Sequence, residues 1–404
     1  MNTLTIAWRN IWRHKLRSLT VMCSVLLGIS AGIYAAALMK GMLEGRFDHF
    51  IENEISHMQV HHPDFVREPE PAYTVATEGD ALQALQGLPG VSAATARLKV
   101  HGMIASANYT GGVQLIGILP EMEEATTGFS DKLMAGENLS SDDGNRILIG
   151  YALAQKMKVD IGSRIVLTFQ DVDQEIVSAA FTVKGFFQTI SNRYDEGVAF
   201  VPAAYLGSHL RTGRAYHEYA ILAEGMDRVE DLRPGVEALF PGMRVRSWDQ
   251  LSPELSFWLE AGGVVSYAFI IIILLGLTFG LLNTMLMTVF ERTRELGMLM
   301  AIGMNKRKVF ALIVMETLLL AVSGAVLGLG IGYGLVRLSA KNGIDLSALS
   351  DVMRELGFSS IIIPDVDTTF LLLIPVMVVI TALLAAVYPA LKALSLNPAE
   401  AVRE

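Results

Sequence analysis

The chain has 404 residues, of which 52% are hydrophobic and 18% are charged, and its formal net charge is −9. This composition is typical of a membrane protein that also carries a large soluble part. The segment 40–260 contains 18 basic and 31 acidic residues, and this excess of acid disfavours a nucleic-acid partner.

Residues 1–17 predict an amphipathic helix that lies in the cytoplasmic interface of a membrane. Apolar side chains recur there at helical spacing, and Arg9, Arg13 and Arg17 form a second stripe. A simpler interpretation stays open at this point, namely that the basic residues only anchor the first span on the inner side.

Four nearly uncharged stretches are each long enough to cross a bilayer, which takes about 20 helical residues. Basic residues gather before the first stretch and between the second and third. We therefore expect these parts and the tail 392–404 in the cytoplasm, and 43–260 outside. The first stretch exceeds the apolar core of a signal peptide, so it should remain as an anchor. The predicted spans are 18–42, 261–290, 309–336 and 368–391.

The region 43–260 has mixed strand and helix signals, which predict an α+β domain of two subdomains. We expect 43–120 and 206–250 to form a discontinuous subdomain, into which a strand-rich subdomain, 121–205, is inserted. The only cysteine, Cys23, lies in the first span, so the outer domain contains no disulfide.

Two further outer features allow more than one interpretation. His57, His61 and His62 lie close together, but no cysteine or patterned carboxylate completes a metal site around them. A polar strand face is the better interpretation, and no metal is expected. The outer loop 337–367 carries a short helical pattern, which would rest on the membrane or on the large domain.

The segment 291–308, between the second and third spans, has a helical face. Leu296, Leu299, Met300 and Gly303 fall on that face. Basic residues flank the helix, so it could float on anionic lipid. It could equally enter a groove on a cytosolic partner, and the pattern alone leaves both alternatives open.

The third span combines small residues with a single acid. Gly324, Gly328 and Gly332 recur at every fourth position, and this spacing predicts close helix packing. A phosphate-binding loop is disfavoured, because these glycines lie in a membrane helix and no GxxxxGK[ST] sequence occurs in the chain. Glu316 is the only charge in the interior of a span, since Lys40 lies near the end of the first one, and it either pairs with protein or reaches the interface.

Several stretches resemble the MacB/FtsX/LolC-type family of ABC transporter permeases. RELGMLMAIGM, at 294–304, is similar to the family's coupling segment. AWRNIWRHKLRSLTVM is similar to its basic N-terminal helix, YPALKALSLNPAEAVRE to its C-terminal segment, and ILIGYALAQKMKVDIGSRIVL to its inserted outer subdomain. The order of one span, a large outer domain and three spans also agrees, so the resemblance covers nearly the whole chain.

The resemblance implies four transmembrane helices with a large α+β extracytoplasmic domain of two subdomains between helices 1 and 2. The chain would lie in the cell inner membrane, with this domain in the periplasm or outside. It would be non-catalytic and hold no cofactor, because ATP and Mg bind to a separate cytosolic ABC ATPase, present in two copies. Hydrolysis there would move the outer domains. The residues expected to couple the chain to the ATPase are Arg294, Glu295, Leu296, Gly297, Leu299, Met300 and Gly303.

The resemblance also implies a second permease chain, identical or related, because each ATPase copy needs a docking helix. Chain length and the loop 337–367 favour the lipoprotein-release branch, which extracts lipoproteins from the inner membrane and hands them to a periplasmic carrier or adaptor. The alternatives are MacB-like efflux of a hydrophobic compound or peptide, and FtsX-like control of a cell-wall hydrolase. Many relatives carry a basic residue at the position of Leu299 or Met300, where this chain is apolar.

Overall fold

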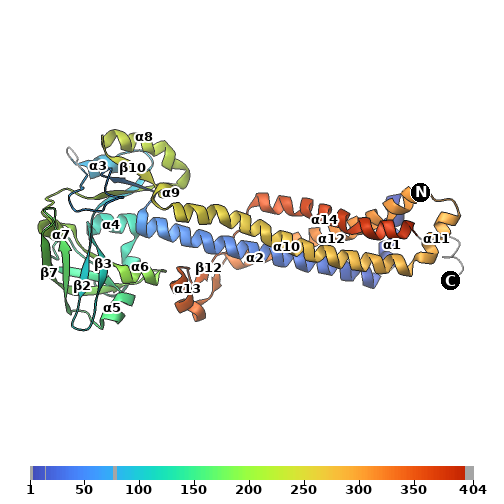
Figure 1. Ribbon diagram of the computed structural model, residues 1–404, viewed down its shortest axis with the longest axis horizontal. Coiled ribbons are helices and arrows are strands. Elements are labelled where there is room, and N and C mark those ends of the chain that lie inside the picture. Colours follow the sequence, from blue (N-terminus) through green and yellow to red (C-terminus); the bar gives the residue numbers. More distant parts are fainter. Residues whose placement is uncertain (1–2, 14, 76–79, 396–404) are drawn as a thin grey trace. The chain divides into compact units, whose positions relative to one another are not determined.

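The computed structural model describes residues 3–13, 15–75 and 80–395. The chain forms two compact units (Figure 1). The membrane unit comprises Met1–Leu43, Leu259–Asp345 and Ile361–Glu404, and the αβ unit comprises Glu44–Trp258 and Leu346–Ser360.

Four helices of the described chain are long and apolar enough to cross a membrane, and they coincide with the four predicted spans. Each includes its predicted apolar stretch, and two run well beyond it, since α2 ends at Phe50 and α10 begins at Pro253. The four helices are α2 (Lys15–Phe50), α10 (Pro253–Glu291), α12 (Lys306–Ala340) and α14 (Thr368–Leu394). The N-terminal segment forms α1 (Thr3–Arg13), which packs against α12 and leaves Trp8 and Trp12 exposed.

Small residues bring α12 close to α2 inside the membrane unit. A Cβ atom built on Gly324 would lie 2.8 Å from the carbonyl oxygen of Met22, and one on Gly328 would lie 2.9 Å from that of Leu26. Ser30 Oγ donates a hydrogen bond of 3.0 Å to the carbonyl oxygen of Gly328. Gly332 continues the same contact line, so any larger side chain at these positions would force the helices apart.

The αβ unit is built on a ten-stranded sheet with the strand order β10-β1-β9-β2-β3-β8-β5-β7-β4, and β6 pairs with both β2 and β7. The strands are β1 (Met58–His61), β2 (Val91–Ala105), β3 (Thr110–Ile118), β4 (Leu133–Gly136), β5 (Arg146–Gly150), β6 (Arg164–Gln170), β7 (Ile176–Phe187), β8 (Val198–Pro202), β9 (Glu218–Ala223) and β10 (Arg244–Ser247). The helices are α3 (Ala81–Gln86), α4 (Pro120–Thr127), α5 (Tyr151–Met157), α6 (Asn192–Gly197), α7 (Ala203–Leu210), α8 (Val229–Leu239) and α9 (Trp248–Leu251). Short turns are η1 (Ile51–Ile55), a π-helix that follows α2, and the 3₁₀ turns η2 (Phe129–Lys132) and η3 (Met226–Arg228).

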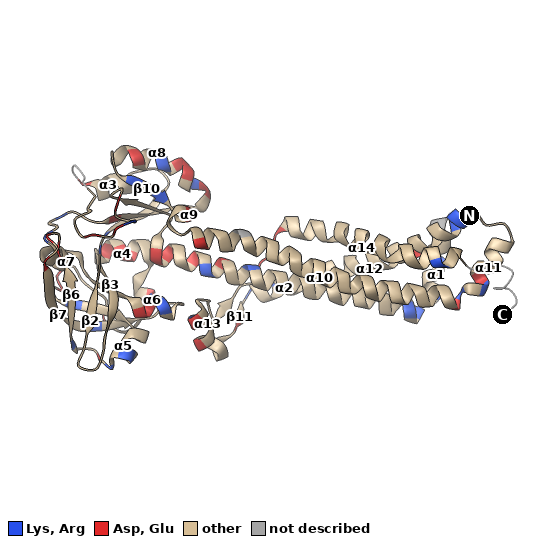
Figure 2. Ribbon diagram, viewed as in Figure 1, with Lys and Arg blue, Asp and Glu red and all other residues tan. Residues whose placement is uncertain are grey.

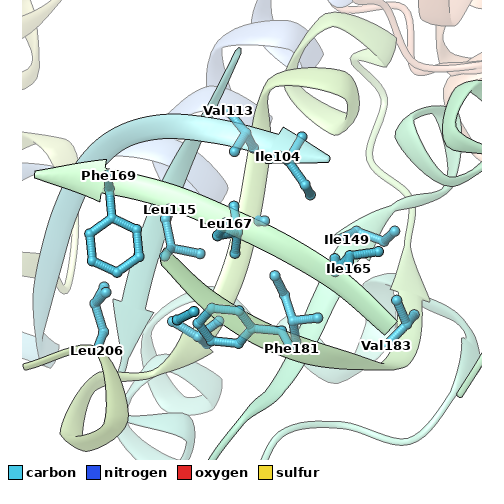
Figure 3. Packing of buried hydrophobic residues seen from close by; sticks show 14 of the residues in the cluster. Ile104, Val113, Leu115, Ile149, Ile165, Leu167, Phe169, Phe181, Val183 and Leu206 are labelled. Atoms are coloured by element: carbon cyan, nitrogen blue, oxygen red, sulfur yellow. The ribbon is translucent and has the colours of Figure 1, made fainter. Parts of the chain in front are cut away.

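Two large apolar cores fill this unit, and their border differs from the predicted one. The core that Figure 3 shows, with Phe181 and Leu167 at its centre, draws its residues from 98–210. The other core draws its residues from 58–96 and 219–245. The predicted border at residue 120 is therefore wrong. β2 is one long strand that pairs with β9 in its first half and with β3 and β6 in its second, so it contributes to both cores.

The outer loop contains the predicted short helix, α13 (Ser350–Leu356), preceded by η4 (Ser347–Leu349) and flanked by the paired strands β11 (Ile344–Asp345) and β12 (Ile361–Ile362). The helix ends at Gly357, whose φ of +75° suits glycine. Phe358 lies beneath the guanidinium of Arg46, 5.3 Å from ring centroid to Cζ, and α13 contacts α6. We expected this helix to rest either on the membrane or on the large domain, and in the structure it contacts the large domain.

The histidines near β1 have structural roles. His57 Nδ1 accepts a hydrogen bond from the backbone N–H of Ala223, and His62 stacks on Tyr73. Within the described ranges, no group of three or more histidine, cysteine, aspartate or glutamate side chains is arranged to hold a metal ion. His61 joins a buried ion-pair network instead.

The network centres on Arg97, which lies at the border between the two cores. Its guanidinium contacts Glu123 Oε1 at 2.7 Å and Glu218 Oε1 at 3.0 Å, and it donates to the backbone oxygen of Glu54 at 3.3 Å. Lys99 and His61 also contact Glu218, at 2.5 and 3.2 Å. Burial acts to raise the pKa of Glu218, but Lys99, His61 and Arg97 together hold this pKa below its ordinary value. The carboxylate is therefore charged and paired inside the protein.

We expect Arg97→Met to lower the free energy of unfolding by about 3–5 kcal/mol, because it leaves the buried Glu123 without its main partner and removes one of the three partners of Glu218. Thermal or denaturant unfolding of the full chain in detergent measures the change. Arg67→Met is the matched control, since the Arg67 side chain is 83% exposed. If both variants unfold like the wild type, the network does not support the fold.

Candidate functional site

The segment between α10 and α12 forms a separate short helix, α11 (Thr293–Ala301). The helical path breaks at Arg292, whose backbone angles leave the helical region. After Ile302, Gly303 adopts a φ of +100°, a conformation that favours glycine and reverses the chain. The Asn305 side chain then caps α12 by accepting a hydrogen bond of 3.1 Å from the backbone N–H of Arg307. Local sequence thus sets both ends of α11.

One face of α11 is buried against the spans. Leu296 is only 3% exposed and packs in a cluster with Val289, Val309 and Ile313, while Met300 lies against the same cluster. From the sequence, we expected Leu296 on the face that meets a partner protein. In the structure, Leu296 instead packs inside the membrane unit. α11 is apolar on two sides, and the side that carries Leu296 is the one that covers the ends of α10, α12 and α14.

The opposite face of α11 is open and largely apolar. Met298 is 45% exposed and Ile302 is 85% exposed, and they follow the exposed Arg294 at successive intervals of four residues. Leu299 borders them and is half-buried. We call Arg294, Met298, Leu299 and Ile302 the outer face of α11. Gly303 is exposed next to the outer face, whereas Gly297 lies on the buried side of α11.

A buried ion pair fixes the start of α11 to the third span. Arg292 Nη1 lies 3.2 Å from Glu316 Oε2 and 3.4 Å from Oε1, and both residues are less than 10% exposed. Of the two alternatives that the sequence allowed for Glu316, a partner in the protein or a position at the interface, the structure shows the partner. Because charges are costly in an apolar bundle unless they are paired, this contact constrains where α10 ends and where α12 lies.

Further ion pairs extend from this contact to the N-terminal helices. Arg292 Nε contacts Glu295 Oε2 at 3.0 Å, and Glu295 Oε1 lies 3.3 Å from Arg13 on α1. Arg17, near the start of α2, forms an ion pair with Glu291 and lies 3.4 Å from the hydroxyl of Thr288. Figure 2 shows charged residues gathered around α1 and α11, whereas most of the length of the long helices is uncharged. These contacts form two groups: one joins α1, the start of α11 and α12 through Arg292 and Glu295, and the other joins α2 to the end of α10.

In the sequence, Arg292 is one of several basic residues that flank α11, and its pairing with Glu316 was not predicted. One signal could have found it: a single acid inside a span needs a cation at a similar depth, and a basic residue at the end of the preceding span is the nearest candidate in sequence. Glu295 was assigned to the contact with an ATPase, and here it bridges Arg292 and Arg13.

Comparison with known proteins identifies the family. A MacB-like periplasmic core domain matches residues 18–239, and an FtsX-like permease C-terminal domain matches residues 267–398. The chain is 22% identical to the lipoprotein-releasing system transmembrane protein LolC of Neisseria meningitidis, over 97% of this chain and 95% of that protein. It is 23% identical to the macrolide export ATP-binding/permease protein MacB of Hyphomonas neptunium, over 89% of this chain and 56% of that protein.

The periplasmic region of MacB from Actinobacillus actinomycetemcomitans aligns with 52% of this chain and 97% of its own length, at 11% identity and a TM-score of 0.38. The family assignment rests on the sequence matches, of which the periplasmic core domain alone spans more than half of the chain. The chain therefore belongs to the MacB/FtsX/LolC-type family of ABC transporter permeases.

Proposed function

We propose that this permease couples ATP hydrolysis by a separate cytosolic ATPase to movement of its αβ unit outside the membrane. The observation that carries the proposal is the outer face of α11. It presents Ile302 and Met298 to solvent on a segment that lies outside all four predicted spans. Exposed apolar side chains beside basic residues suit a groove on a protein partner better than open water.

The ATPase would bind ATP and Mg, because this sequence contains no GxxxxGK[ST] loop. Its nucleotide-driven closure would move α11, and the Arg292–Glu316 pair would pass this movement to α12. Pulling the two charges apart inside the bundle would leave each without its partner, so α11 and α12 should move together. Each nucleotide state would then favour one of two arrangements of the spans.

The proposed complex contains two permease chains and two ATPase subunits. ABC ATPases hydrolyse ATP at the interface between two copies, and each chain described here carries one α11. The second permease would be an identical chain or a related one. We assign the complex to the cell inner membrane, with the αβ unit in the periplasm or outside.

For the substrate, we propose lipoproteins that are extracted from the membrane. Support comes from the LolC relatives, which are named for lipoprotein release and match this chain almost end to end. A periplasmic lipoprotein carrier or adaptor would then be a further partner. Efflux of a hydrophobic compound or peptide is the second candidate, because relatives named for macrolide export match 89% of the chain in one case. Regulation of a cell-wall hydrolase is the third.

The topology can be tested by cysteine labelling. In a Cys23→Ala background, we expect Ser208→Cys, at an exposed position on α7, to react with a membrane-impermeant maleimide added to the outside of cells. The reason is that basic residues concentrate on the opposite side of the predicted spans. Reaction from the cytoplasmic side alone would invert the proposed topology.

Docking can be tested with Ile302→Asp. We expect this change to weaken association with the ATPase that co-purifies with the wild-type chain by at least about tenfold, since burial of such a side chain contributes roughly 1.5–3 kcal/mol. Co-purification in detergent and ATP turnover measure the effect, and Leu299→Asp should act in the same direction.

The matched control for Ile302→Asp is Ile176→Asp, because Ile176 is 75% exposed on β7 of the αβ unit. This control should bind the ATPase like the wild type. Unchanged association and turnover in Ile302→Asp would mean that α11 is only a lipid-facing spacer, and the proposed coupling would fail.

The ion pair can be tested by reversing charges. Glu316→Lys should sharply lower thermal stability in detergent and ATPase stimulation, because it places two cations together in the bundle. Glu316→Gln should be milder. Adding Arg292→Glu to Glu316→Lys restores opposite charges and should recover roughly 0.5–3 kcal/mol of the lost stability. A double variant as damaged as the sum of its singles would show that the two side chains do not act as a pair.

A further inference from the structure

A cavity of about 340 Å³ lies within the αβ unit, beside the last turns of α2. Its wall comes from Arg46 to Glu54, from the start of α6 and from Gly357. This volume falls within the range of small-molecule sites in proteins. Phe50, Ile190 and Val198 give it an apolar side, and its polar lining consists of Arg46, His49, Glu54, Ser191, Arg193 and Tyr194.

Two arginines line the cavity, Arg46 and Arg193, and neither makes an ion pair or hydrogen bond with any residue that the structure describes. Arg46 is held in place without an acid. Its guanidinium lies over the ring of Phe358, and a Cβ atom on Gly357 would come within 3.7 Å of its Cζ. A guanidinium that stacks on a ring keeps its N–H groups available, and these suit a carboxylate or phosphate.

His49 also lines the cavity. Asn53 Nδ2, which can only donate, lies 2.7 Å from His49 Nδ1, so this ring nitrogen accepts and the ring proton sits on Nε2. Nε2 is closed off from water-sized groups and has no hydrogen-bond partner within the described chain, so it does not contact a ligand in the cavity.

An acidic group faces the same cavity. Glu54 lines it and makes no ion pair or side-chain hydrogen bond among the described residues. The neighbouring Asp195 differs, because its carboxylate already accepts hydrogen bonds from the backbone N–H and the hydroxyl of Thr189, at 3.0 and 2.8 Å. Arg46, Arg193 and Glu54 therefore line the cavity without an ion pair or side-chain hydrogen bond to the described chain. Burial raises the pKa of Glu54 to about 7, and a bound cation would favour its charged form.

We propose that this cavity binds a small zwitterion. Arg46 and Arg193 receive its phosphate or carboxylate, and Glu54 receives its ammonium group. Two sources share this chemistry, namely the phosphoethanolamine headgroup of a phospholipid and a free amino acid. The site does not depend on the proposed ATPase coupling, because none of its residues belongs to the membrane unit.

The test uses the full-length permease in detergent and isothermal titration with four probes. O-phosphoethanolamine and glycine carry both charges, glycerol 3-phosphate carries only the anion, and ethanolamine carries only the cation. We expect saturable binding of at least one zwitterion, and at least about tenfold weaker binding of the matching single-charge probe. Arg46→Gln and Arg193→Gln should each weaken the zwitterion by at least about tenfold, and Arg46→Lys by less.

Glu54→Gln separates the two halves of the site, because it should abolish the preference for a zwitterion over an anion while anion binding persists. Arg67→Gln, an exposed arginine of the same unit, is the control and should bind like the wild type. Circular dichroism confirms that each variant is folded.

A competition experiment distinguishes a lipid headgroup from a free amino acid as the ligand. Phosphatidylethanolamine in nanodiscs should compete with O-phosphoethanolamine if the ligand is a lipid headgroup, and phosphatidylglycerol should not. Binding of glycine without O-phosphoethanolamine assigns the site to amino acids. No saturable binding of either zwitterion, or wild-type affinity in all three variants at Arg46, Arg193 and Glu54, overturns the proposal.

Discussion

The ion pair between Arg292 and Glu316 is the contact on which the geometry of the membrane unit depends. Two opposite charges lie among apolar helices, and each is tolerated there because the other is within 3.2 Å. This requirement places the end of α10 against α12 and sets the direction in which α11 begins. Leu296 then packs inward and Ile302 is left outward, so the exposed apolar surface of α11 is a consequence of the buried pair.

Arg97 has a comparable role in the αβ unit. It holds two buried carboxylates at the point where β2 passes from one core to the other, and it also bonds the backbone of Glu54 in the π-helical turn that follows α2. π-Helical turns often occur at functional sites, and this one contributes Glu54 to the cavity beside α6. The sheet and the end of α2 are therefore linked by one side chain.

Much of this architecture could be predicted from the sequence. Hydropathy located the four spans, and the spacing of Gly324 and its neighbours indicated close helix packing without naming the partner, which is α2. The orientation of α11 could not be predicted, because the helix is apolar on two sides and only tertiary packing decides which side is buried. The pairing of Arg292 was not predicted either, because several basic residues flank α11 and only the fold brings one of them to Glu316. The border near Arg97 was missed because β2 is a continuous strand and carries no turn signal between the two cores.

The central claim is that an ATPase binds the outer face of α11. Hydrogen–deuterium exchange on the full-length permease in nanodiscs, with and without the co-purified ATPase, tests it most directly. The account predicts slower exchange of backbone amides within 294–305 when the ATPase is bound, and little change in β6 and β7, which lie in the core of the αβ unit. Unchanged exchange in 294–305 under saturating ATPase, with protection elsewhere in the chain, would contradict the account.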